Sequence, residues 1–172
     1  GEGHFCNPSE YIKPLSEMEY LEKSGIRNEI FNFTTQHVAR SNNINDRFIY
    51  EMAINKWLYE GKRLSYLDIP PERQTHRNKE SFLNRFQVVD PNGKCHTLVA
   101  HIAMDGHYYI YPTQSPTIEN VRSITVREAA RIQSFPDDYF FEGSRTAAFT
   151  QIGNAVPVVL AEKIALELKR QL

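Results

Sequence analysis

Apolar side chains between positions 42 and 62 recur at spacings of three and four residues, the period of a helix with one buried face. Gly61 follows the last of them and is expected to end this helix. A shorter helix is predicted within 14–25, where Ser16 is a candidate cap and Gly25 lies beyond the end. The first third of the chain is therefore expected to contain two helices.

The pattern changes after the longer helix. Residues 68–81 are polar and contain two adjacent prolines, which predicts a loop. From Phe82 onward, the runs FLNRFQVVD, CHTLVAHIA and HYYIYP are rich in β-branched and aromatic residues, and the turn sequences PNGK and MDG separate them. We expect these runs to form an antiparallel meander of three strands.

The rest of the chain returns to helical spacing, with three helices in succession. Their ends are marked by Thr125 with Glu128 (a capping box) and Pro136 for the first, by Ser144 and Gly153 for the second, and by Pro157 for the start of the third. The apolar stripe of the third helix comprises Val158, Ala161, Ile164, Ala165 and Leu168.

Composition narrows the class of protein. The net charge of −1 argues against a chain that is basic throughout, although a local basic face remains compatible with it. No apolar run approaches the roughly 20 residues that a membrane-spanning helix needs, so no membrane partner is expected. Cys6 and Cys95 are too few and too far apart for a disulfide framework, which favours a cytoplasmic location. Because the chain begins with Gly1, we expect it to be part of a longer protein.

Candidate chemistry is sparse when the residues are considered by themselves. There is no glycine-rich phosphate loop, and the histidines have no metal-ligand spacing, so no metal site is expected. The basic stretch Arg73–Lys79 is either a solvated loop or a set of phosphate contacts. The turn Gly153–Asn154 before the last helix is either an ordinary connection or a place where free amide donors meet an anionic or polar ligand.

Two long segments decide between these alternatives. RSITVREAARIQSFPDDYFF and GSRTAAFTQIGNAVPVVLAEKIALEL resemble the last two motifs of the DNA cytosine-5 methyltransferases, the R-x-LT-x-RE-x-AR-x-Q-x-FPD and Q-x-GNAVP blocks. Together they cover 122–168 almost continuously. The preceding part, including the Thr97–Leu98 pair, is similar to the target-recognition domains of this family, with looser agreement.

The resemblance implies roles for particular residues. The first motif is a helix that joins the recognition and catalytic domains, and its charged residues would fix that junction: Arg127, Glu128, Arg131 and Asp137. The second motif would border the pocket for S-adenosyl-L-methionine through Asn154, Ala155 and Val156. For double-stranded DNA, the expected contacts are Arg73, Arg77, Lys79 and Thr97.

The family's catalytic elements are missing from this chain. Its nucleophile is a cysteine that follows a proline, and its thiolate attacks a flipped cytosine. Cys6 lies in FCNP and Cys95 in KCHT, and neither context matches. Glu119–Asn120 is out of place for the family's Glu-Asn element. No catalytic residue is therefore assigned here. The alternative to an enzyme part is a stand-alone DNA-binding module, for which the intact Gln151–Pro157 pattern has no use.

The resemblance also predicts an architecture. We expect an α+β chain whose target-recognition domain contains a small antiparallel sheet, followed by C-terminal helices that pack on a Rossmann-like catalytic domain in the intact enzyme. The predicted divisions are an irregular segment at 1–30, the recognition domain at 31–121 and the closing helices at 122–172. The implied partners are DNA, an N-terminal catalytic half or subunit and a cognate restriction endonuclease, with a cytoplasmic, nucleoid-associated location.

Overall fold

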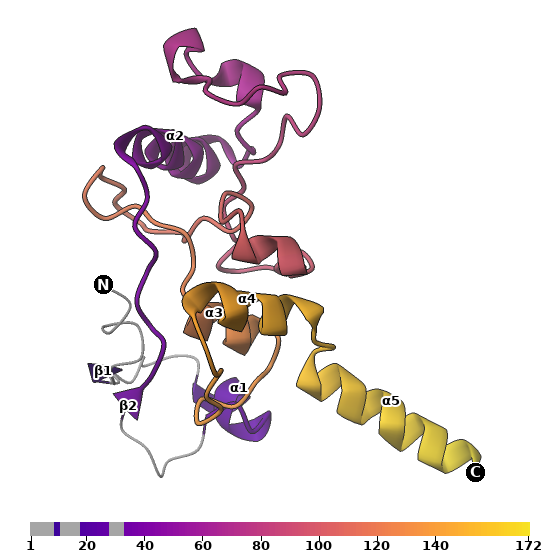
Figure 1. Cartoon of the computed structure of the whole chain (residues 1–172). Helices are drawn as coiled ribbons and strands as arrows, with labels where there is room; N and C mark the ends of the chain where they lie inside the picture. Colours follow the sequence, from indigo (N-terminus) through magenta and orange to yellow (C-terminus); the bar gives the residue numbers. More distant parts are fainter. Residues whose placement is uncertain (1–8, 11–17, 28–32) are drawn as a thin grey trace. The chain divides into compact units, whose positions relative to one another are not determined.

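The computed structural model describes residues 9–10, 18–27 and 33–172, which are mainly helical with little strand (Figure 1). The elements are β1 (Ser9–Glu10), α1 (Met18–Lys23), β2 (Phe33–Thr34), α2 (Ile44–Glu60), the 3-10 helices η2 (Tyr66–Asp68), η3 (Pro71–Arg73) and η4 (Ala100–Ala103), α3 (Val126–Ile132), α4 (Arg145–Asn154) and α5 (Val158–Gln171). The predicted cap Ser16 lies outside the described residues.

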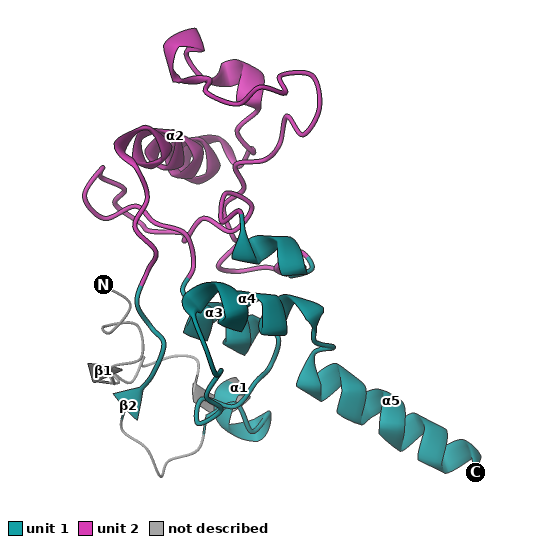
Figure 2. Ribbon diagram, viewed as in Figure 1, with its two compact units in different colours: residues 1–38, 97–104, 125–172 teal, residues 39–96, 105–124 magenta. Residues whose placement is uncertain are grey.

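The chain divides into two compact units (Figure 2). The first unit comprises Gly1–Val38, Thr97–Met104 and Thr125–Leu172, and the second comprises Ala39–His96 and Asp105–Ile124. Each unit is thus built from segments that are distant in sequence. This division follows contacts within the chain, and the predicted domain boundaries stay a prediction.

Helix α2 is the main element of the second unit and confirms the helix predicted from periodicity. Asn43 caps it by accepting a hydrogen bond from Asp46 N at 2.8 Å, and Gly61 ends it in the left-handed region at φ 63°. Its buried face belongs to one apolar cluster: Ile49, Tyr50, Ala53, Ile54, Leu64, Tyr66, Ile69, Phe86, Val88, Ile110 and Val121. Burial of this cluster stabilises the second unit.

The three-stranded meander predicted for 82–112 was wrong. Its first and third runs are joined by a single parallel bridge, Val88–Ile110, and Ile110 also forms an antiparallel bridge with Ser123, which lies outside the three predicted runs. Most of the middle run, Thr97–Ala103, contains η4 and belongs to the first unit, so it supplies no strand to the second. Among the described residues, the only sheet is the antiparallel pair β1–β2.

Helix α3 begins as predicted and ends earlier than predicted. The capping box is complete, since Thr125 Oγ1 accepts from Glu128 N at 3.2 Å and Glu128 Oε2 accepts from Thr125 N at 2.7 Å. At the other end, Ser134 is left-handed at φ 54°, and Phe135 N donates to Ala130 O at 2.9 Å. This left-handed cap stops the helix before Pro136 is reached.

Gly153 lies inside α4 and does not stop it, contrary to the sequence-based prediction. Helix α4 packs against η4 within the first unit. A Cβ atom on Gly153 would lie 2.5 Å from the backbone nitrogen of Ala100, which is closer than any real contact. Glycine is therefore required here for the close approach of two backbones.

Replacing Gly153 by alanine should destabilise the chain by roughly 1–3 kcal/mol, the usual range for overpacking. This net loss already includes a gain of about 1 kcal/mol, because alanine has a higher helix propensity than glycine. Urea denaturation measures the change, with Thr146→Ala as control because Thr146 is exposed on the same helix. Equal stability of the two variants would mean that α4 and η4 do not approach this closely.

Helix α5 carries the predicted apolar stripe, but no other described residue covers it. None of its residues is buried, and three members of the stripe, Val158, Ile164 and Leu168, retain 40%, 50% and 57% exposure. In the described part of the chain, no helix is both long and apolar enough to cross a membrane. The stripe therefore remains available for a partner.

Candidate functional site

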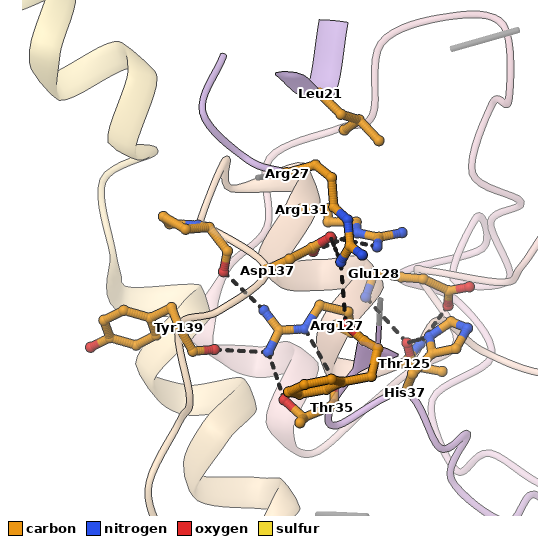
Figure 3. A network of polar contacts seen from close by, with 12 residues as sticks. Leu21, Arg27, Thr35, His37, Thr125, Arg127, Glu128, Arg131, Asp137 and Tyr139 are labelled. Atoms are coloured by element: carbon orange, nitrogen blue, oxygen red, sulfur yellow. Dashed lines mark hydrogen bonds and ion pairs between the residues drawn. The ribbon is translucent and has the colours of Figure 1, made fainter. Parts of the chain in front are cut away.

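Arg127 is the centre of the first motif, and its side chain is fully buried in the first unit (Figure 3). Its guanidinium donates to Thr35 O at 3.1 Å, Thr35 Oγ1 at 3.1 Å, Pro136 O at 3.0 Å and Tyr139 O at 2.8 Å. Burial lowers the pKa of Arg127, and Asp137 opposes that shift. One side chain thus joins the segment before α2 to the turn after α3.

Asp137 binds two arginines in the same region (Figure 3). Arg131 binds it with both arms, Nε to Oδ1 at 2.8 Å and Nη2 to Oδ2 at 2.7 Å. Arg27 Nη1 lies 3.5 Å from Oδ2, and the side chains of Arg27 and Asp137 are only 5% and 4% exposed. The carboxylate therefore fixes the FPD turn against both α3 and the segment after α1.

Glu128 has the local role that its capping-box position predicts. The Thr125 hydroxyl that it helps to orient also lies 3.0 Å from His37 Nδ1. The hydrogen bonds described here for Arg127, Glu128, Arg131 and Asp137 join residues of the first unit. Their role as a domain junction stays a prediction.

Two residues that the sequence analysis left without a role connect the two motifs. Gln133 Nε2 donates to Ile152 O at 3.0 Å and to Ala155 O at 3.2 Å, at the end of α4. The start of α5 is held in turn, because Val158 N donates to Gln133 O at 3.1 Å and Val159 N donates to Ser134 Oγ at 3.0 Å. The free amide donors expected before α5 are thus partly occupied by the chain itself.

Gln36 was also missed by sequence reasoning. It is fully buried, and its amide exchanges two hydrogen bonds with the backbone of Phe141, Nε2 to O at 2.9 Å and N to Oε1 at 3.1 Å. Its own carbonyl accepts from Arg127 N at 3.1 Å. These contacts span about 90–105 positions of sequence, and no local pattern signals them.

The predicted cofactor residues lie at the end of α4. Asn154 is exposed, and its carboxamide makes no hydrogen bond to any residue of the described chain. Val156 is 59% exposed and Ala155 is half-buried as the helix cap. This short segment offers a donor, an acceptor and an apolar surface to a ligand.

The predicted DNA contacts divide into two groups. Arg77 and Lys79 are exposed, with no hydrogen bond or ion pair to a described residue. Arg73 is half-buried: its Cζ lies 3.8 Å from the centre of the Phe48 ring, and its Nη1 donates to Asn45 Oδ1 at 3.4 Å. Thr97 is exposed and belongs to the first unit, whereas the basic loop belongs to the second.

Arg85 positions the basic loop and was not identified from the sequence. Its guanidinium donates to Asn78 O at 2.8 Å, Ser81 O at 2.7 Å and Phe82 O at 2.9 Å, and it stacks on Tyr66 at 4.4 Å. A buried arginine that satisfies three carbonyls holds the backbone of 78–82 in one conformation. The exposed side chains of Arg77 and Lys79 therefore extend from, or directly beside, backbone that Arg85 holds in place.

Titratable groups do not form an activated nucleophile in the described residues. Burial raises the pKa of the Cys95 thiol to about 11, so it stays protonated at neutral pH. Burial also raises the pKa of Tyr50, whose hydroxyl lies 2.8 Å from His107 Nδ1. Burial, then Arg85 and His107, lowers the pKa of His76 beside them. Cys6 lies outside the described residues.

The two sequence motifs that these contacts join are similar to those of an enzyme class, the methyltransferases that act on DNA. Residues 6–170 match the model of the C-5 cytosine-specific DNA methylases, and the chain belongs to this family. The comparison confirms the resemblance drawn from the two motifs.

Relatives of known name support the same assignment. The chain is 43% identical over 173 residues to the type II methyltransferase M.Bpa9945I of Bacillus paralicheniformis, covering 98% of this chain and 37% of that protein. It is 44% identical over 93 residues to the putative type II methyltransferase M.OihORF3336P of Oceanobacillus iheyensis, and this match covers 54% of this chain and 19% of that protein. The chain therefore spans about a third of the length of the first relative. No solved structure matches it.

Proposed function

We propose that this chain is the C-terminal part of a DNA cytosine-5 methyltransferase, which recognises double-stranded DNA and completes the S-adenosyl-L-methionine pocket. The observation that carries the proposal is the match over 98% of this chain to 37% of a type II methyltransferase. The catalytic cysteine comes from an N-terminal half or subunit, because neither cysteine here has the required Pro-Cys context. The cofactor supplies the methyl group, and this chain's residues bind and orient it.

The exposed segment Asn154–Val156 fits a role at the edge of the cofactor pocket, because its carboxamide has no partner in the described chain. The side chain of Gln133 supports this segment by donating hydrogen bonds to two carbonyl groups at the end of α4. For DNA, Arg77 and Lys79 are proposed as phosphate contacts and Thr97 as a contact near the flipped nucleotide. Arg73 is proposed to act from a more fixed position. A restriction endonuclease partner and a cytoplasmic, nucleoid-associated location stay predictions.

The purified chain alone is expected to transfer no methyl groups to DNA, since no activated thiolate is present among its described residues. Adding a catalytic part that carries the cysteine and the cofactor motifs should restore transfer. Incorporation of labelled methyl groups into DNA measures both reactions. Transfer by the chain alone would contradict the proposal. DNA binding that no catalytic part converts into transfer would favour the stand-alone DNA-binding module.

Asn154→Ala should raise the Kd for S-adenosyl-L-methionine in the assembled enzyme by up to about tenfold, the effect of losing one hydrogen bond worth roughly 0.5–1.5 kcal/mol. Calorimetric titration of the cofactor measures this change. DNA affinity without cofactor should be unchanged, and Thr146→Ala on the same helix should bind cofactor normally. Weaker DNA binding with unchanged cofactor affinity would move Asn154 out of the cofactor pocket.

A further inference from the structure

A group of arginines in the second unit has no role in the contacts described above. They line a pocket of about 220 Å³ that is formed by 39–42, the beginning of α2 and 119–122. All three segments belong to the second unit, whose backbone is magenta in Figure 2. Its lining residues are Ala39, Arg40, Ser41, Asn42, Arg47, Glu119, Asn120, Val121 and Arg122. The lining thus contains three guanidinium groups and one carboxylate. We call it the Arg47 pocket.

Arg47 is not explained by helix stability. It is the fourth residue of α2, close to the positive end of the helix dipole, where a cation is unfavourable and an anion is favourable. No hydrogen bond or ion pair joins its side chain to another described residue. An arginine beside a helix N-terminus, together with two further arginines, produces a local field that attracts anions, and Glu119 offsets part of this field.

The other polar groups of the pocket suit a hydrated oxyanion. Arg122 is held in place, because its Cζ stacks 3.8 Å from the centre of the Tyr111 ring and its Nη1 donates to Ser123 O at 3.2 Å. Asn42 Oδ1 is buried and has no hydrogen-bond partner within the described chain, so a bound water or ligand would satisfy it. The Ser41 hydroxyl is exposed at the same rim.

The carboxylate of Glu119 opposes anion binding in this pocket, so anion affinity can be raised as well as lowered by substitution. Hydrogen bonds to its carboxylate from its own backbone and from Thr117, together with Arg47, lower the pKa of Glu119, so it is ionised at neutral pH. It therefore offsets part of the positive field. Removing this charge should strengthen anion binding, and removing Arg47 should weaken it.

From this arrangement we infer that the Arg47 pocket binds a phosphate group, and specifically a phosphodiester of the DNA backbone. The inference rests on the proposed DNA-binding function. The pocket volume is several times the ~30 Å³ share of one water molecule, which leaves room for a phosphate with bridging waters. Arginine forks match the geometry of phosphate oxygens, and such contacts position a protein on DNA without reading bases.

The test uses the assembled enzyme and a labelled DNA duplex in salt titrations. Arg47→Gln should weaken binding by about tenfold, equally on cognate and unrelated DNA, and should make the salt slope shallower by about one unit. Glu119→Gln should tighten binding by roughly two- to fivefold. The matched control is Arg63→Gln, because Arg63 is an exposed arginine of the same unit outside the pocket.

Only opposite effects of the two pocket variants, with Arg63→Gln near wild type, support the inference. Unchanged binding in Arg47→Gln, or a loss equal to that of the control, would overturn it while the proposed function stands. Titration with inorganic phosphate distinguishes the ligand sources: an Arg47-dependent phosphate affinity without an effect on DNA would also overturn it. Absence of DNA binding by the assembled wild-type enzyme would overturn the proposed function as well.

Discussion

Replacement of Arg127 by methionine is expected to lower the free energy of unfolding by about 3–5 kcal/mol. The reason is the number of partners left without a donor, which are the carbonyls of Thr35, Pro136 and Tyr139 and the hydroxyl of Thr35. Since Arg127 is fully buried, water cannot take over these bonds. Urea denaturation followed by circular dichroism measures the loss.

Two further variants test whether this loss depends on the shape of the guanidinium. Arg127→Lys keeps the charge but cannot reach four acceptors at once, so it should recover only a minor part of the stability. Arg170→Met, on exposed α5, should change stability by no more than about 0.5 kcal/mol. If Arg127→Met costs as little as this control, the network in Figure 3 does not hold the first unit together.

The second large effect is expected at Asp137, where Asp137→Asn should cost about 3 kcal/mol. The substitution leaves the guanidiniums of Arg27 and Arg131 without their counter-charge, and Arg27 is only 5% exposed. Arg131→Ala should cost less, about 1–2 kcal/mol, because its side chain is 25% exposed and Arg27 remains beside the carboxylate.

The test is which of these two substitutions causes the larger loss of stability. Denaturation midpoints of Asp137→Asn and Arg131→Ala, compared at low and high salt, should show the larger loss at Asp137 under both conditions. Salt should narrow the difference little, since buried charges are poorly screened. A larger loss at Arg131 would mean that Asp137 does not tolerate the loss of this partner and that the turn is fixed mainly by α3.

Local signals in the sequence predicted helix starts well. Thr125 and Ser144 act as the caps that the sequence predicted, because a cap requires only a side chain and the backbone two or three residues away. Helix ends were less certain. Gly153 was interpreted as a stop, yet glycine also permits the close approach of another backbone, and the approaching segment lies more than fifty positions away.

Contacts that are distant in sequence were not predictable in this way. The run CHTLVAHIA has strand-like composition, but its partner is α4 and not a neighbouring strand. In the candidate site, the resemblance identified Arg127 and Asp137, whereas their partners Thr35 and Arg27 carry no recognisable pattern. The Arg47 pocket likewise combines segments about 75 positions apart, and only the folded chain brings its charges together.

The uncovered stripe of α5 links the stability of this chain to the concentration of any partner that covers the stripe. A partner that covers Val158, Ile164 and Leu168 would bind the folded helix in preference to the unfolded chain, and it would stabilise the fold by mass action. Each tenfold rise in the free concentration of such a partner above its Kd would add about 1.4 kcal/mol to the free energy of unfolding. The melting temperature of this chain would then rise with the concentration of that partner.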